Sequence, residues 1–269
     1  MPDGVGRTAL GMARVRAEES RRPDRLFDDP YAQLFSDAAP GALPAGVRPA
    51  PGDPMAGVVH GAVIRTRFYD DFLLDAATRG CRQVVLAGAG LDTRAFRLDW
   101  PDGLRLWEID RPDVLTFKDR ILADVGAAPG CERRAVAADL RGPWQGQLVE
   151  AGFRPAEPAA WLVEGLLTYL TADEAASLLS AVTELSAPGS RLACEQPAEA
   201  PRDPPAVSPQ LAPFAAMWKG GLGAGLSQWL AEEGWQVRVI TRDAVATALG
   251  RPPPVRSHGG YLTATRPDG

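Results

Sequence analysis

The sequence has few of the residues that bind metals or form disulfide frameworks. Its 269 residues include 3 cysteines and 2 histidines. Cys81, Cys131 and Cys194 stand far apart without a CxxC pair, and His60 and His258 are equally isolated. A zinc site needs several such ligands at close spacing, and a disulfide framework needs an even set of cysteines. We therefore expect neither a metal centre nor stabilising disulfides.

Long apolar runs and basic tracts are also missing. No stretch approaches the roughly 18 apolar residues of a membrane span, and the opening segment MPDGVGRTALGMARVRAEES has no signal-peptide core. Lys+Arg number 29 against 34 Asp+Glu, giving a formal net charge of −5 at pH 7. Binders of nucleic acids and anionic membranes need a basic surface. The sequence therefore predicts a cytoplasmic protein without a nucleic-acid or membrane partner, and it leaves the oligomeric state open.

Glycine and proline are concentrated in two blocks, which divide the chain. We expect residues 39–54 to form a surface loop. Residues 197–225 form either a solvated loop or a lid over a ligand, and the apolar residues embedded there, such as Trp218, favour the lid. A chain of this length can bury one core without disulfides or metals. The predicted organisation is a single domain, with an N-terminal cap over 1–54, a core over 55–196, a lid over 197–225, and closing helices and strands over 226–269.

Strand and helix patterns alternate along the predicted core. Helices are predicted over residues 6–22 and 55–78, and another begins at the capping box formed by Thr171 and Glu174. Strand-like runs precede and follow that box: CRQVVLAGAG, GLRLWEID, RRAVAAD, PAAWLVEGLLTYL and SRLACEQ. Strands alternating with helices predict an α/β fold with a doubly wound, mostly parallel sheet. We expect the last strand, YLTATR, to insert antiparallel.

A glycine turn and a spaced acid suggest a nucleoside-type ligand. Gly88-Ala89-Gly90 follows the first predicted strand, but Thr93 replaces the third glycine of a dinucleotide fingerprint. Asp110 stands 20 residues after Gly90, at the end of the second predicted strand. An acid there can accept both ribose hydroxyls, as in NAD and S-adenosylmethionine sites. A plain tight turn with an exposed acid remains the alternative.

Two further acids lie near strand ends. Asp139 ends the third predicted strand, and Glu164 lies within the apolar run WLVEGLL of the fourth. Acids at successive strand ends converge on one crevice of a doubly wound sheet. An ionised Glu164 would be costly to bury unpaired, so it should face a polar ligand or a cation. An ion pair with an arginine is the alternative.

Several longer strings give a specific resemblance. TALGMARVRAEESRRPDRLFDDPYA, IRTRFYDDFL, AGAGLDTRAFRL and WEIDRPDVLTFK together resemble the leucine carboxyl methyltransferase family, in its bacterial S-adenosylmethionine-dependent branch that includes polyketide O-methyltransferases. The resemblance implies a class I methyltransferase with a Rossmann-like fold and S-adenosyl-L-methionine as cofactor.

The resemblance also implies roles for individual residues. The methionine part of the cofactor would contact Arg65 through its carboxylate and Glu164 through its amino end. The turn would contact the methionine backbone and the adenosyl group through Gly88, Ala89, Gly90 and Asp92. Asp110 would bind the ribose, and Asp139 and Leu140 would hold the adenine. Arg141 and Tyr169 would hold the carboxylate of the methyl acceptor.

The predicted activity is O-methylation of a carboxylate on a small molecule or peptide of natural-product type. A carboxylate is already ionised at neutral pH, whereas a phenol with a pKa near 10 needs a base. The scarcity of histidines favours the carboxylate, although His258 is a candidate base. Three alternatives remain: a phenol O-methyltransferase, a nicotinamide-dependent oxidoreductase on a similar core, and a non-catalytic module that binds an adenosyl ligand.

Overall fold

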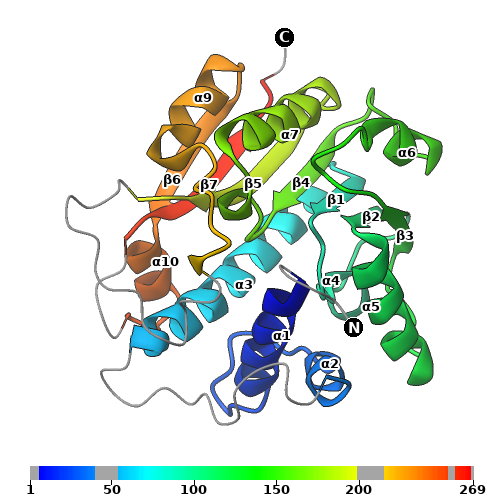
Figure 1. The fold of residues 1–269 in the computed structure, drawn as a ribbon, viewed down its shortest axis with the longest axis vertical. Helices are drawn as coiled ribbons and strands as arrows, with labels where there is room; N and C mark the ends of the chain where they lie inside the picture. The colour runs from blue at the N-terminus through cyan, green and yellow to red at the C-terminus, as the bar shows by residue number, and fades with distance from the viewer. Residues whose placement is uncertain (1–5, 40–53, 199–214, 254–257, 268–269) are drawn as a thin grey trace.

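The computed structural model describes residues 6–39, 54–198, 215–253 and 258–267. A seven-stranded sheet forms the centre of this part of the chain, in the order β3-β2-β1-β4-β5-β7-β6 (Figure 1). The strands from β1 to β5 are parallel, and β7 runs antiparallel to both β5 and β6. This confirms the predicted sheet with its antiparallel last strand. The strand bounds are β1 Gln83–Ala87, β2 Arg105–Asp110, β3 Glu132–Ala137, β4 Ala159–Val163, β5 Arg191–Gln196, β6 Gln236–Thr241 and β7 Gly260–Thr265.

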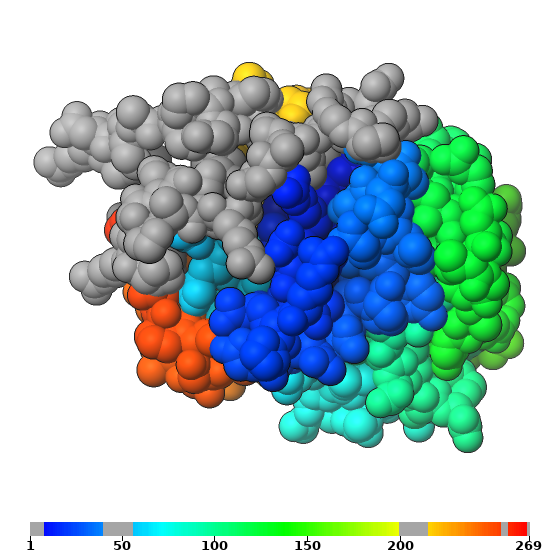
Figure 2. Space-filling model, turned by 90° about the horizontal axis from the view of Figure 1, so that it is seen from below, coloured from blue at the N-terminus to red at the C-terminus, as the bar shows by residue number. Residues whose placement is uncertain are grey.

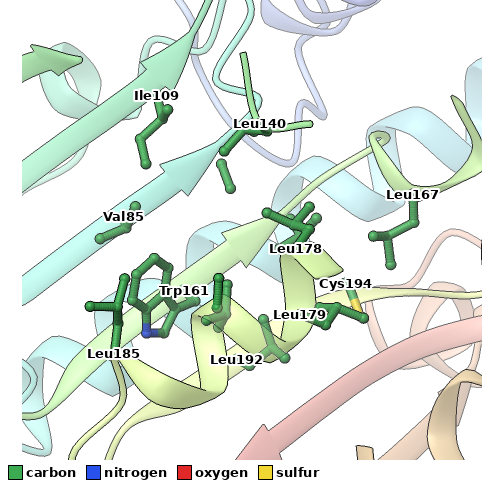
Figure 3. Close-up of a cluster of buried hydrophobic side chains, with 14 of the residues drawn as sticks. Val85, Ile109, Leu140, Trp161, Leu167, Leu178, Leu179, Leu185, Leu192 and Cys194 are labelled. Carbon is green, nitrogen blue, oxygen red and sulfur yellow. The ribbon is translucent and has the colours of Figure 1, made fainter. Parts of the chain in front are cut away.

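Helices cover both faces of the sheet because the buried strands present apolar side chains alternately to each side. In β1, Val85 and Ala87 belong to one buried cluster, and Val84 and Leu86 to another. The first cluster packs against α6 Gln145–Glu150, α7 Ala172–Glu184 and α9 Leu226–Glu232, and the second against α3 Pro54–Thr78 and α10 Arg242–Ala248. Figure 3 shows Trp161 of β4 beside Leu185, which follows α7, in the first cluster, which also contains Leu178 and Leu179 of α7.

The N-terminal helices add a further layer outside the second face. Helices α1 Gly6–Ser20 and α2 Ala32–Asp37 pack on α5 Pro112–Asp124 through a third apolar cluster that includes Leu10, Phe35 and Phe117. Figure 2 shows this blue segment lying between the orange α10 and the green side of the molecule. The helix predicted over 6–22 is confirmed as α1, which ends at Ser20, two residues before the predicted end. The loop predicted over 39–54 lies almost entirely outside the described residues, as does most of the lid predicted over 197–225.

The fourth strand is shorter than predicted. The run over 158–170 forms β4 only as far as Val163, and Leu167–Tyr169 forms a short 3-10 helix, η1. Gly165 has a φ of +66°, a conformation that favours glycine, and it turns the chain out of the sheet. The expectation that Glu164 lies inside a strand was therefore wrong: it is the first residue after β4. Asp139, which was predicted to end the third strand, lies two residues after the last residue of β3.

Local signals at helix ends are confirmed. The Thr171 side chain accepts from the Glu174 N–H, and the Glu174 side chain accepts from the Thr171 N–H. This capping box fixes the start of α7 directly after η1. Across the described ranges, none of the helices combines the length and the apolar character needed to cross a membrane.

Candidate functional site

A cavity of about 1110 Å³ opens at the carboxyl ends of the parallel strands. Its wall is built from α1, from α3, and from the segments that follow β1, β2, β3 and β4. Every site residue predicted from the sequence lines it: Arg65, Gly88, Ala89, Gly90, Asp92, Asp110, Asp139, Leu140, Arg141, Glu164 and Tyr169. A search of the described residues finds no group of three or more His, Cys, Asp or Glu side chains that could hold a metal ion.

The glycine turn brings one backbone N–H, that of Gly90, to Asp110. Gly88 has a φ of +77°, and a Cβ there would lie 3.2 Å from Leu166 Cδ2. The Gly90 N–H donates to Asp110 Oδ2 at 2.6 Å, and the Arg111 N–H donates to Oδ1 at 2.7 Å. A carboxylate has about four acceptor positions, so two remain for a ligand. Burial raises the pKa of Asp110 despite these two bonds. The acid is half-buried rather than exposed.

Arg94 is the centre of a buried ion-pair network behind the turn. Its side chain is 2% exposed, and its Nε donates to Asp70 Oδ1 at 2.7 Å. Its Nη1 donates to Glu164 Oε2 at 2.8 Å and also to Asp92 Oδ2. Burial opposes ionisation of Glu164, but Arg94 and Arg65 outweigh it and lower the pKa of that carboxyl. The ion pair considered as an alternative for Glu164 is therefore present.

Arg65 links α3 to the ends of two strands. Its Nε donates to Glu164 Oε1 at 2.9 Å, and its Nη1 donates to Glu195 Oε1 at 2.8 Å. Within the described ranges, its Nη2 has one hydrogen-bond partner, Met12 Sδ at 3.5 Å, which is a weak acceptor. The side chain is 20% exposed, so Arg65 is not a solvated helix charge. The Nη2 end keeps donors for a ligand carboxylate.

Glu195 is a site residue that the sequence reasoning missed. Both of its carboxylate oxygens lie 3.0 Å from the Gly165 N–H, which donates to them just after β4. It lines the cavity from β5, next to the buried Cys194. Like Glu164, Glu195 is an acid in an otherwise apolar run of the sequence, here SRLACEQ, and this signal could have identified it.

The charges around Glu164 do not balance. Three guanidinium groups face four carboxylates in one connected network, which leaves one formal negative charge; its members are Arg65, Arg94, Arg97, Asp70, Asp92, Glu164 and Glu195. Buried charge is stable only when it is compensated. This end of the cavity therefore suits a ligand with one net positive charge.

The two residues predicted to hold the acceptor lie at different depths. Arg141 Nε donates to Asp139 Oδ1 at 2.9 Å, and both side chains are about half exposed, at 52% and 46%. The Arg141 guanidinium lowers the pKa of Asp139 to about 2. Tyr169 belongs to η1 and is partly buried. The structure brings both to the cavity wall, with Arg141 already engaged by Asp139.

The paired carboxylates predict a loss of stability in acid. Burial opposes ionisation of Asp29, Asp92 and Glu164, yet their arginine partners lower each pKa below its ordinary value. Their stabilisation is present above the unfolded-state pKa, near 4, and is lost as pH falls through the folded-state values. Asp110, whose pKa is raised, contributes with the opposite sign but is a single group.

We therefore expect the free energy of unfolding to fall as pH drops below about 4. Denaturant unfolding at a series of pH values measures this dependence. The variant Asp29→Asn serves as the comparison, because it removes one of the three groups and should flatten the curve. Stability that rises between pH 5 and pH 3 would contradict the assignment.

The sheet order, the glycine turn after β1 and the acid at the end of β2 define a Rossmann-like α/β protein with a crevice suited to an adenosyl ligand. The model of the leucine carboxyl methyltransferase family matches residues 9–183. A relative from Parafrankia sp. (strain EAN1pec), provisionally named an S-adenosyl-L-methionine-dependent methyltransferase, is 51% identical over 98% of this chain and 87% of its own length. A relative of the same provisional name from Frankia alni is 51% identical over 99% of this chain and 96% of its own.

The chain therefore belongs to the leucine carboxyl methyltransferase family and is an S-adenosyl-L-methionine-dependent methyltransferase. A solved structure from Thermobifida fusca YX, provisionally described as a methyltransferase, has the same fold, with a TM-score of 0.60 over 95% of this chain and 94% of that chain at 19% identity. This membership excludes the nicotinamide-dependent oxidoreductase that the sequence pattern had left as an alternative.

The residues present fit this cofactor. S-adenosyl-L-methionine carries a sulfonium and an ammonium against one carboxylate, so its single net positive charge matches the negative network around Glu164. Asp110 has free acceptor positions for ribose hydroxyls, and the Nη2 end of Arg65 has donors for the carboxylate. Gly88 leaves open the space that a Cβ would fill next to Leu166.

Proposed function

We propose that the protein methylates a carboxylate oxygen of a small molecule or peptide of natural-product type, acting as a single methyltransferase domain. One observation carries this proposal: the described part of the cavity wall contains no histidine, and its acids near Glu164 are held in ion pairs. His60 is bonded to the Arg251 carbonyl oxygen, and His258 is exposed. Carboxyl groups with lowered pKa values are weak bases for a phenol, whereas a carboxylate acceptor needs none.

The proposed cofactor contacts follow from the donors and acceptors that the wall offers. Arg65 binds the methionine carboxylate, and Glu164 binds the amino end. Asp110 accepts from the ribose hydroxyls. The remaining contacts come from the glycine turn and the segment after β3: Gly88, Ala89, Gly90, Asp92, Asp139 and Leu140. When bound, S-adenosyl-L-methionine supplies a methyl group on a positively charged sulfur, which becomes a neutral thioether once the acceptor oxygen takes the methyl.

The protein's own contribution is positioning and the exclusion of water. Arg94 holds Asp92 and Glu164, and Glu195 holds Arg65 and the Gly165 backbone, so the groups around the reacting atoms are fixed in advance. Orientation of this kind can supply about 7–11 kcal/mol of a barrier. Arg141 and Tyr169 orient the acceptor carboxylate without forming a covalent bond.

We expect methyl esters as products when the protein is incubated with methyl-labelled S-adenosyl-L-methionine and a panel of matched carboxylic acids and phenols. Mild base hydrolyses an ester and releases the label as volatile methanol, whereas an aryl methyl ether survives. Volatile label from the acids alone supports the proposal. Base-stable label from the phenols would favour phenol methylation. Binding of the cofactor without transfer to any acid of the panel would contradict the proposed carboxylate methylation.

A further inference from the structure

Arg242 lies in the part of the cavity that the proposed cofactor contacts leave unused. It follows directly on β6 as the first residue of α10, and it lines the cavity. In the sheet, Tyr261 of β7 is paired with both Glu195 of β5 and Ile240 of β6. Because β6 runs in the same direction as β5, Arg242 reaches the same edge of the sheet as the acids of the site.

Arg242 differs from other arginines of the cavity in having no counter-charge. Carboxylates pair with Arg16, Arg22, Arg65, Arg94, Arg97, Arg111 and Arg141. Among the described residues, no carboxylate lies within ion-pair distance of the Arg242 guanidinium, and its buried Nε has no hydrogen-bond partner. A buried donor without an acceptor is costly. An anion bound from the cavity would remove that cost.

The position of Arg242 separates it from the cofactor. Apart from Arg65 of α3, the proposed cofactor residues belong to the segments that follow β1, β2, β3 and β4, whereas β6 lies three strands beyond β4 in the sheet. At about 4.8 Å per strand, the backbones of β4 and β6 are roughly 14 Å apart. Tyr261 of β7, which lies between β5 and β6 in the sheet, also lines the cavity, and its hydroxyl already donates to the Gly61 carbonyl oxygen at 3.3 Å. Among the described residues that line this side of the cavity, Arg242 is the charged group without an ion-pair partner.

We propose that Arg242 binds an anionic group of the methyl acceptor, separate from the oxygen that is methylated, so that the acceptor is an organic diacid or a similar dianion. The cavity is then polarised, with a negative network around Glu164 for the cofactor and a positive group beyond β5 for the acceptor. An arginine fork matches a carboxylate through two parallel hydrogen bonds. The inference rests on the proposed function, because it places the acceptor in the same cavity.

The test measures binding to the protein loaded with S-adenosylhomocysteine, so that no turnover occurs. The probes are straight-chain dicarboxylates of increasing length as monomethyl and dimethyl esters, which differ by one carboxylate. We expect a monomethyl ester to bind at least about tenfold more tightly than its dimethyl ester. The variant Arg242→Met should lose this preference, and Arg242→Lys should keep part of it.

The control variant is Arg238→Met, which removes an exposed arginine of β6 that does not line the cavity. It should keep the full preference for the monomethyl ester. Equal binding of both esters to the unmodified protein, or a preference that survives in Arg242→Met, would overturn the inference. If the preference depends on Arg242 but no methyl ester forms in the product assay, the anion site stands and the proposed carboxylate methylation fails.

Discussion

Replacing Arg94 with methionine should lower the free energy of unfolding by about 3–5 kcal/mol. The Arg94 side chain is 2% exposed and pairs with Asp70, Asp92 and Glu164. Methionine fills a similar volume but leaves Asp92 and Glu164 with less compensation in a buried setting. Removing one partner of a buried pair costs far more than the pair contributes, because the remaining charge is stranded. Denaturant unfolding followed by circular dichroism measures the change.

Arg141→Met is the matched control, because it breaks an arginine–aspartate pair that is about half exposed. Exposed pairs contribute less than about 1 kcal/mol, so this variant should unfold close to the unmodified protein. Arg94→Lys should fall between the two, since it keeps the charge but loses the fork that reaches three carboxylates. Equal losses in Arg94→Met and Arg141→Met would show that burial of the network does not set its energy.

The fold was predictable because its signals are local and repeated. The capping box at Thr171 and the alternation of apolar runs with helical segments each indicate one element. Their sequence then allows few sheet topologies. The error at β4 has a local cause as well: the apolar run continues past Val163, but the left-handed conformation of Gly165 ends the strand. Composition alone does not distinguish a longer strand from a strand followed by a 3-10 turn.

The candidate site was predictable only where its residues have a sequence signature. Gly88, Asp110 and Glu164 stand at strand ends in recognisable spacings, and all three line the cavity. Arg94 and Arg242 have no such signature, because an arginine after a turn usually belongs to the surface. Their roles depend on which carboxylates the fold brings close, and that depends on strand order and helix packing. The arrangement of ion pairs is therefore a property of the tertiary structure.

The same distinction explains why the acceptor is harder to identify than the cofactor. Apart from Arg65 of α3, the proposed cofactor contacts come from the ends of adjacent parallel strands, whose order follows from the sequence pattern. The proposed acceptor region combines the end of β6 with β7 and the segment around Trp218, which are distant in the chain. Function resides in such assembled sites rather than in the fold itself. The charge of Arg242 is thus the most direct chemical information about the acceptor.

Replacing Asp110 with alanine should weaken binding of S-adenosyl-L-methionine at least about 100-fold, because the ribose hydroxyls lose a charged acceptor that is worth about 1.5–3 kcal/mol per hydrogen bond. The apo protein should lose less than about 2 kcal/mol of stability. The Gly90 and Arg111 N–H groups lose their acceptor, but the raised pKa of Asp110 shows that burying this carboxylate is itself unfavourable. Titration calorimetry with the cofactor and S-adenosylhomocysteine separates the binding loss from unfolding.

The control variant is Asp113→Ala, which removes an exposed acid outside the cavity and should bind both ligands normally. Unchanged affinity in Asp110→Ala would remove Asp110 from the cofactor site and with it the proposed placement of the adenosyl group along β2.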